Sequence, residues 1–202
     1  MNKAKIVGKK SIQSILNERE LLAQLKHPFI INMHYAFQDK VHLYIVTDLI
    51  EGGDLRYHMR KRKNFTEKES KFLVAWVVAG LEYMHTNGCL HKDIKPENLL
   101  MGEDGYIRIT DMGISKMRTP DNASDTSGTP GYMAPEIMCR QNHDVAADFY
   151  ALGIISYELM IGKRPYGGKD RNEIRDNVLK EQASIKKSMI PEGWGIEAII
   201  IS

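Results

Sequence analysis

The sequence predicts an α+β fold with a small first domain at residues 1–50 and a larger, mainly helical second domain at residues 51–202. Three observations predict it. Before residue 50, apolar residues at helical spacing are followed by a strand-like stretch. The turn "EGGD" then interrupts the chain at residues 51–54, and two long apolar helical segments lie beyond it. We therefore expect the domain boundary at this turn.

The first domain is predicted to hold an amphipathic helix over residues 11–26. Glu18 falls on the same stripe as Ile15, Leu22 and Leu25, because a helix turns about 100° per residue. A carboxylate within a buried face needs a cation, so an ion pair is the favoured interpretation, and extension of Glu18 to solvent is the alternative. The stretch "VHLYIVTDL" is rich in β-branched and aromatic residues and predicts a strand.

Two long helices are predicted in the second domain. The first begins at Thr66, which has Glu69 three residues later as in a capping box and Phe65 in the staple position, and it ends near Gly88. The second, "AADFYALGIISYELMIG", is apolar on every side, which is typical of a helix in the centre of a domain.

A hairpin is predicted between these helices, because "NLLM" and "YIRITD" read as short strands joined by the turn "GEDG". An antiparallel hairpin brings its ends to within about 5 Å of each other. Asn98 at its entrance and Asp111 at its exit therefore become neighbours.

Composition excludes several classes of protein. With 43% apolar and 27% charged residues the chain is globular, and a formal charge of +2 does not indicate a nucleic-acid partner. The basic run at residues 60–63 is interpreted as a solvated loop. Cys89 and Cys139 lack metal-site spacing and favour a reducing compartment. The longest apolar run, residues 72–81, is too short to span a bilayer, so we expect a cytoplasmic protein.

The polar residues of "HKDIKPENLL" indicate phosphate chemistry. Asn98 and Asp111 offer the hard oxygen ligands that Mg²⁺ prefers. Asp93 then lies beside the metal, where it can orient or deprotonate a hydroxyl group, and Lys95 can neutralise charge on a phosphoryl group in transfer. The alternative is that Asp93 and Lys95 form a loop salt bridge and that Asp111 caps a turn.

The motifs "HKDIKPENLL", "TDMGIS", "GTPGYMAPE" and "DFYALG", in this order and spacing, resemble those of eukaryotic protein kinases over essentially the whole chain. "NERELLAQLKHPFI", "GGDL" and "RPYGG" are most similar to the AGC group of serine/threonine kinases, near the cyclic-nucleotide-dependent kinases. The resemblance implies a two-lobe kinase fold with a partial small lobe. It also implies transfer of the γ-phosphoryl group of Mg-ATP to serine or threonine of protein substrates, with ATP and Mg²⁺ as cofactors.

The resemblance assigns roles to individual residues. Asp93 is the expected catalytic base, Lys95 the phosphate-facing cation, and Asn98 and Asp111 the metal ligands. The expected nucleotide-binding residues are Glu18 as partner of the ATP-binding lysine, Thr47 behind the adenine, Asp48 and Ile50 as backbone contacts, and Asp54 at the ribose. Lys95 and Thr129 imply serine/threonine specificity, and Asp148 is expected to anchor the catalytic loop.

The sequence departs from the family pattern at both ends. It contains no G-x-G-x-x-G, and the expected ATP-binding lysine would fall two residues before Met1. We expect a chain truncated at both ends, with Ile199, Ile200 and Ile201 poorly covered and doubtful activity. The alternatives are a catalytically silent kinase-like binding module and a non-functional fragment. Met112 replaces the usual Phe and is expected to pack against Leu22, Met33 and His91 as a flexible filler.

Two further expectations concern substrates and switching. Glu97 and Asp54 are expected to favour arginine or lysine before the phosphorylated residue, unless Glu97 only pairs with a neighbouring cation. Asp125 stands where many family members are phosphorylated, and Lys92 replaces the usual arginine. We expect these two side chains to pair. The alternative is a phosphorylation site at Ser124 or Thr126.

Overall fold

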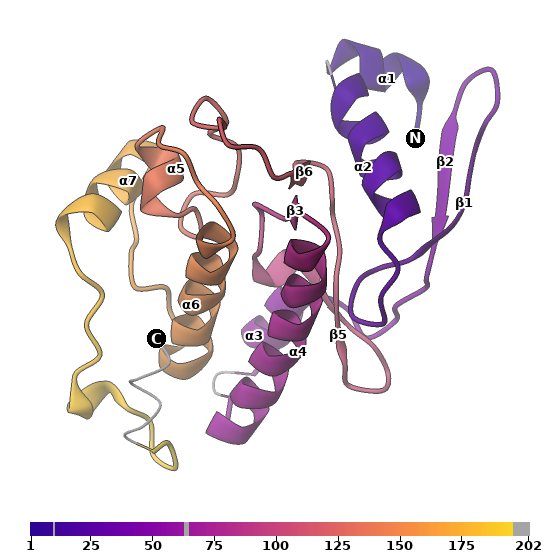
Figure 1. Ribbon diagram of the computed structural model, residues 1–202. Coiled ribbons are helices and arrows are strands. Elements are labelled where there is room, and N and C mark those ends of the chain that lie inside the picture. The colour runs from indigo at the N-terminus through magenta and orange to yellow at the C-terminus, as the bar shows by residue number, and fades with distance from the viewer. Residues whose placement is uncertain (10, 63–64, 196–202) are drawn as a thin grey trace.

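The computed structural model describes residues 1–9, 11–62 and 65–195. Helices and antiparallel strands are both present, which confirms the α+β class (Figure 1). The isoleucine-rich ending at residues 199–201 lies outside the described residues.

The first 50 residues form two helices and a hairpin. Helices α1 (Lys3–Gly8) and α2 (Ile12–Gln24) precede strands β1 (Met33–Gln38) and β2 (Leu43–Thr47), which pair antiparallel. α2 confirms the helix predicted over residues 11–26, whereas the sequence analysis did not predict α1. α2 packs against β1, and the indigo and violet ribbons of Figure 1 show this arrangement.

The remainder of the chain is mainly helical. Its α-helices are α3 (Leu55–Lys61), α4 (Glu67–Thr86), α5 (Pro135–Met138), α6 (Ala146–Ile161) and α7 (Arg171–Lys180). Two short 3₁₀ turns are η1 (Pro96–Asn98) and η2 (Lys187–Met189). The antiparallel strand pairs are β3 (Cys89–Leu90) with β6 (Lys116–Met117), and β4 (Leu99–Met101) with β5 (Ile107–Ile109).

The interpretation of residues 60–63 as a loop is wrong for the first two of these residues. Arg60 and Lys61 belong to the last turn of α3, where cations are favourable beside the free carbonyl groups. The sequence signal was missed because α3 is short and follows the glycine turn directly. Lys63 lies outside the described residues.

Helices α4 and α6 lie side by side at the centre of this part (Figure 1). The predicted capping box of α4 is confirmed: the Glu69 amide donates to Thr66 Oγ1 at 3.2 Å, and the Thr66 amide donates to Glu69 Oε2 at 2.9 Å. α4 also packs on the β4–β5 hairpin through Gly80. A Cβ atom there would lie 2.8 Å from Ile109 Cδ1 and 3.2 Å from the Phe29 carbonyl oxygen, so a larger residue would require these neighbours to shift.

One apolar cluster joins the two parts of the chain. It contains Leu22 from α2 together with Leu81, Ile109 and Met112. Met112 is fully buried in it, as expected for an apolar filler, and Met33 packs against the same cluster. The Ile31 amide donates to the Ile109 carbonyl at 2.9 Å, so backbone hydrogen bonds also connect the two parts. None of the helices within the described residues is long and apolar enough to cross a membrane.

Candidate active site

The loop after β3 is anchored by one buried carboxylate, as expected for Asp148. Its oxygens accept the His91 amide at 2.9 Å, the Lys92 amide at 2.7 Å and His85 Nε2 at 2.8 Å. Lys92 has a left-handed φ of 71°, which a residue other than glycine adopts at a cost. Burial alone raises the pKa of Asp148, but these hydrogen bonds and the nearby histidines outweigh it, and the net shift is downward. Asp148 therefore holds the loop in its strained conformation.

Asp93 lies in this loop with three side-chain donors around its carboxylate. Lys95 Nζ and Thr129 Oγ1 each donate to it at 2.6 Å, and Asn98 Nδ2 donates at 3.2 Å. Burial by itself raises the pKa of Asp93, but the hydrogen bonds from Lys95 and Thr129 and the charge of Lys95 lower it overall. The carboxylate is thus ionised at neutral pH and fixed in orientation. The salt bridge considered as an alternative is present, and it is compatible with the catalytic role.

Thr129 also accepts from Lys95 Nζ at 2.9 Å. From the sequence, Thr129 was expected only to indicate serine/threonine specificity, and this contact was not predicted. The two residues are 34 positions apart, and no local pattern indicates that they meet.

The predicted β4–β5 hairpin is present, and it places Asn98 opposite Thr110, the residue before Asp111. Leu99 pairs with Ile109, and the Thr110 amide donates to the Asn98 carbonyl at 2.9 Å. Both hydrogen bonds recorded for the Asn98 side chain use Nδ2, which leaves Oδ1 as a free ligand atom among the described residues. Asp111 is exposed and has a left-handed φ of 65°.

These two oxygens, one amide and one carboxylate, fit the hard donor set of Mg²⁺. No group of three or more histidine, cysteine, aspartate or glutamate side chains within the described residues could hold a metal ion. Mg²⁺ in phosphate-transfer sites commonly takes one or two protein oxygens and completes its coordination with water and phosphate.

Helix α2 contacts the loop after Asp111 through two side chains. Ser14 Oγ donates to the Gly113 carbonyl at 2.5 Å, and Asn17 Nδ2 donates to the Ser115 carbonyl at 2.6 Å. Glu18, on the same helix, is half-buried. Burial and the charge of Asp111 raise its pKa. No ion pair of Glu18 is recorded among the described residues, so the predicted ion pair has no support there.

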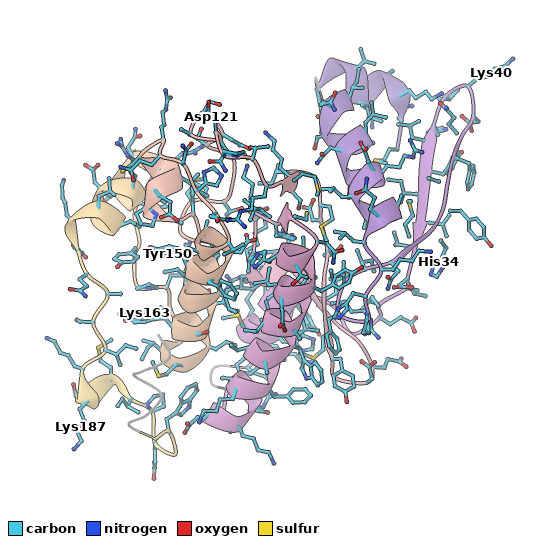
Figure 2. The ribbon with its side chains drawn as sticks, viewed as in Figure 1. His34, Lys40, Asp121, Tyr150, Lys163 and Lys187 are labelled. Atoms are coloured by element: carbon cyan, nitrogen blue, oxygen red, sulfur yellow. The ribbon has the colours of Figure 1, made fainter. Side chains whose placement is uncertain are left out.

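The expected adenine-binding residues lie at and after the end of β2. The Asp48 carboxylate accepts the Asn32 amide at 2.9 Å and bonds to His34, which is labelled in Figure 2, at 2.8 Å. The Asp48 amide donates to the Asn32 carbonyl at 3.0 Å. The backbone N–H of Asp48 is therefore used within the protein, whereas its carbonyl accepts, from the described residues, a single long bond from Thr47 Oγ1 at 3.3 Å. Ile50 packs against the apolar cluster.

Asp54 has a structural task that the sequence analysis did not predict. Its Oδ1 accepts the Tyr57 amide at 2.7 Å and so caps the N-terminus of α3. Its second oxygen, Oδ2, accepts no hydrogen bond from the described residues and is the atom left for the expected ribose contact.

Asp125 and Lys92 form the ion pair that was expected from their positions. Lys92 Nζ also donates to Ser127 Oγ at 2.9 Å, and Lys116 Nζ approaches Asp125 at 2.8 Å. Although burial raises the pKa of Asp125, its bonds to Lys116, Lys92 and Ser127 lower it strongly. The segment that begins near Asp121, labelled in Figure 2, is thereby held against the catalytic loop. Lys116 was not predicted as a partner.

Glu97 pairs with a cation, as in the alternative interpretation, and that cation is Arg56, which lies 41 residues earlier in the sequence. Arg56 Nε donates to Glu97 Oε1 at 3.0 Å. The sequence analysis missed Arg56, because an isolated arginine after a glycine turn carries no recognisable pattern.

Comparison with known proteins gives the family. A family model described as "Protein kinase domain" matches residues 1–197. The chain is 41% identical over 181 residues to a Caenorhabditis elegans protein named "Putative ribosomal protein S6 kinase alpha-1", covering 89% of this chain and 23% of that protein. It is 38% identical over 189 residues to a probable serine/threonine-protein kinase of Dictyostelium discoideum, covering 93% of this chain and 41% of the relative.

A third relative is a Caenorhabditis elegans protein named "cAMP-dependent protein kinase, catalytic subunit-like". It is 36% identical over 188 residues, which cover 93% of this chain and 47% of that protein. The chain thus spans 23% to 47% of the length of these relatives, and the two Caenorhabditis elegans names agree with the AGC-group resemblance of its motifs. Because the family model matches nearly the whole chain, the chain belongs to the protein kinase domain family.

Proposed function

We propose that this chain transfers the γ-phosphoryl group of Mg-ATP to serine or threonine side chains of protein substrates. One observation carries the proposal: the ionised Asp93 carboxylate is fixed by Lys95, Asn98 and Thr129 beside a hairpin that presents two further oxygen ligands. The family and the named relatives support the same activity.

In this mechanism Asp93 accepts a hydrogen bond from the substrate hydroxyl group and takes its proton as the phosphoryl group transfers. Lys95 bridges Asp93 and Thr129, and its ammonium group neutralises charge on the phosphoryl oxygens. Asn98 and Asp111 would hold Mg²⁺, which when bound neutralises the phosphate chain of ATP.

The nucleotide would lie between the two proposed domains, residues 1–50 and 51–202. Thr47 would line the back of the adenine pocket, and the carbonyl of Asp48 and the backbone of Ile50 would bond to the base. Asp54 would reach the ribose with Oδ2, because Oδ1 caps α3. Glu18 would pair with a lysine, whose charge would oppose the burial and the Asp111 charge that raise its pKa.

The proposed substrates are proteins with basic residues before the serine or threonine, selected by the acidic Glu97 and Asp54. The proposed location is cytoplasmic, which the free thiols of Cys89 and Cys139 support.

The experiment is a phosphorylation assay of the chain with Mg-ATP and a serine peptide, together with nucleotide binding by calorimetry. Asp93→Ala should lower turnover by about 10²–10⁴-fold and leave ATP affinity near that of the wild type. The control is Asp121→Ala, which removes an exposed carboxylate outside the loop and should leave turnover unchanged. Equal turnover in Asp93→Ala would remove Asp93 from the base role.

A second candidate function is a kinase-like module that binds nucleotide or partners without turnover. The observation that favours it is that no ion pair of Glu18 is recorded among the described residues. ATP binding with no phosphoryl transfer by the wild-type chain would support this candidate over the first.

A further inference from the structure

Three side chains from three segments meet at the Arg56 guanidinium group. Nη1 and Nη2 donate to the two oxygens of Glu158 at 2.8 and 3.1 Å, and Nε donates to Glu97 at 3.0 Å. Nη2 also bonds to the hydroxyl group of Tyr132, which in turn donates to Glu158 at 2.7 Å. Every nitrogen of the guanidinium group is therefore bonded, in the bidentate geometry that arginine makes and lysine does not.

The charges of this cluster do not balance. Two carboxylates face Arg56, so one negative charge remains after the pairing. Glu158 is nearly buried at 9% side-chain exposure, whereas Glu97 is 42% exposed and faces solvent. The guanidinium group of Arg164 lies 5.6 Å from the Tyr132 ring, but its recorded hydrogen bond goes to the Pro130 carbonyl. Without Arg56, the cluster would be an acidic pocket with the shape of a guanidinium group.

This cluster adjoins the proposed site of phosphoryl transfer. Glu97 follows Asp93 by four residues, and four residues span at most about 14 Å. A substrate peptide in extended conformation advances about 3.3 Å per residue, so a side chain two to four residues from the phosphorylated hydroxyl can reach the cluster. Tyr132 lies three residues after Thr129, which itself bonds to Asp93.

We propose that Arg56 is an internal occupant of a guanidinium-binding site, and that an arginine of the substrate must displace it to bind there. Arg56 thus sets how strongly arginine-bearing peptides are selected. The role of a substrate arginine rests on the proposed kinase function, whereas the guanidinium-binding site itself does not depend on that function. Because this site binds a guanidinium group through several hydrogen bonds, it discriminates arginine from lysine.

The first test needs no phosphoryl transfer. In Arg56→Ala the two carboxylates lose their cation, so millimolar guanidinium chloride should raise the melting temperature of this variant above its value in equal methylammonium chloride. The wild type should show no such difference, because its site is filled. Arg60→Ala is the matched control, since it removes an exposed arginine one turn further along α3.

The second test measures the binding of a fluorescent peptide with arginine before its serine, against the same peptide with alanine there. The ratio of the two affinities should rise at least about tenfold in Arg56→Ala, the equivalent of one charge-assisted hydrogen bond. Should Arg56→Ala not fold, Arg56→Lys retains a cation without the fork and should raise the ratio to a smaller extent.

Absence of both the guanidinium effect and the change in peptide preference would overturn the proposal. If the proposed kinase function is wrong, the result is different. Neither the wild type nor any variant then phosphorylates a peptide, but guanidinium chloride still raises the melting temperature of Arg56→Ala.

Discussion

At the scale of single residues, the surroundings decide what each carboxyl group can do. Asp93, Asp125 and Asp148 are all withdrawn from water, which alone would raise their pKa values, yet hydrogen bonds and cations lower all three. Glu18 has burial and the charge of Asp111 acting on it, and its pKa is raised instead. Asp111 is exposed, so its charge is available for a cation from solution.

Asp111→Ala should therefore weaken Mg²⁺-dependent nucleotide binding, because it removes the charged member of the ligand pair. The measurement is ATP affinity by calorimetry with Mg²⁺ and with a chelator. Asp104→Ala is the control, since Asp104 lies in the turn of the same hairpin and pairs with Arg108. If the wild type bound nucleotide equally well in chelator, the proposed metal site would be wrong.

At the scale of elements, the segment of residues 121–129 is held to the catalytic loop by charge rather than by apolar packing. Asp125 bonds to Lys92 and Lys116, and Ser127 adds a further hydrogen bond to Lys92. A phosphate group carries about −1.5 to −2 charges and would match an arginine fork, whereas one carboxylate suits an ammonium group. Lys92 and Asp125, which both differ from the usual residues of the family, thus form a contact that needs no phosphorylation.

Asp125→Ala should lower phosphorylation activity, because Lys92 would lose its partner and the segment its attachment. The double variant Ser124→Ala with Thr126→Ala should retain activity. The assay is peptide phosphorylation, and limited proteolysis of the segment gives a readout that does not need activity. A loss confined to the double variant would identify Ser124 or Thr126 as a phosphorylation site and refute the built-in contact.

At the scale of the whole molecule, buried carboxylates connect parts that are distant in sequence. Asp148 joins α6 to α4 through His85 and to the catalytic loop through two amides. Asp125 joins its segment to the same loop through Lys92. Stability therefore depends on these groups remaining ionised.

Stability should consequently fall in acid. The folded pKa values of Asp93, Asp125 and Asp148 lie below the unfolded value near 3.9, so their contribution is present above about pH 4 and is lost as the pH falls through the folded values. Glu18 has a raised pKa and acts in the opposite direction. Urea midpoints from pH 7 to pH 3 measure the effect.

Asp125→Asn should flatten this pH dependence, because it removes one of the depressed groups. Asp176→Asn, an exposed carboxylate on α7, should leave the dependence as in the wild type. A wild-type midpoint that rises on acidification would contradict the prediction.

Local patterns predicted the elements that local physics decides. The capping box at Thr66 and Glu69, the buried helix around Ile155 and the hairpin that joins Asn98 to Asp111 are each encoded within a few neighbouring residues. The catalytic loop could also be identified from the sequence, because its resemblance to the family lies in consecutive residues.

The sequence by itself thus determined the fold class, the family and the residues of the proposed chemistry, since periodicity, caps and motifs are local. Only the tertiary structure decided the polar contacts that no motif had indicated. Arg56 with Glu158, Lys116 with Asp125 and Thr129 with Asp93 are pairs separated by 102, 9 and 36 residues. Their distances depend on how helices and loops pack, and no periodic pattern carries that information.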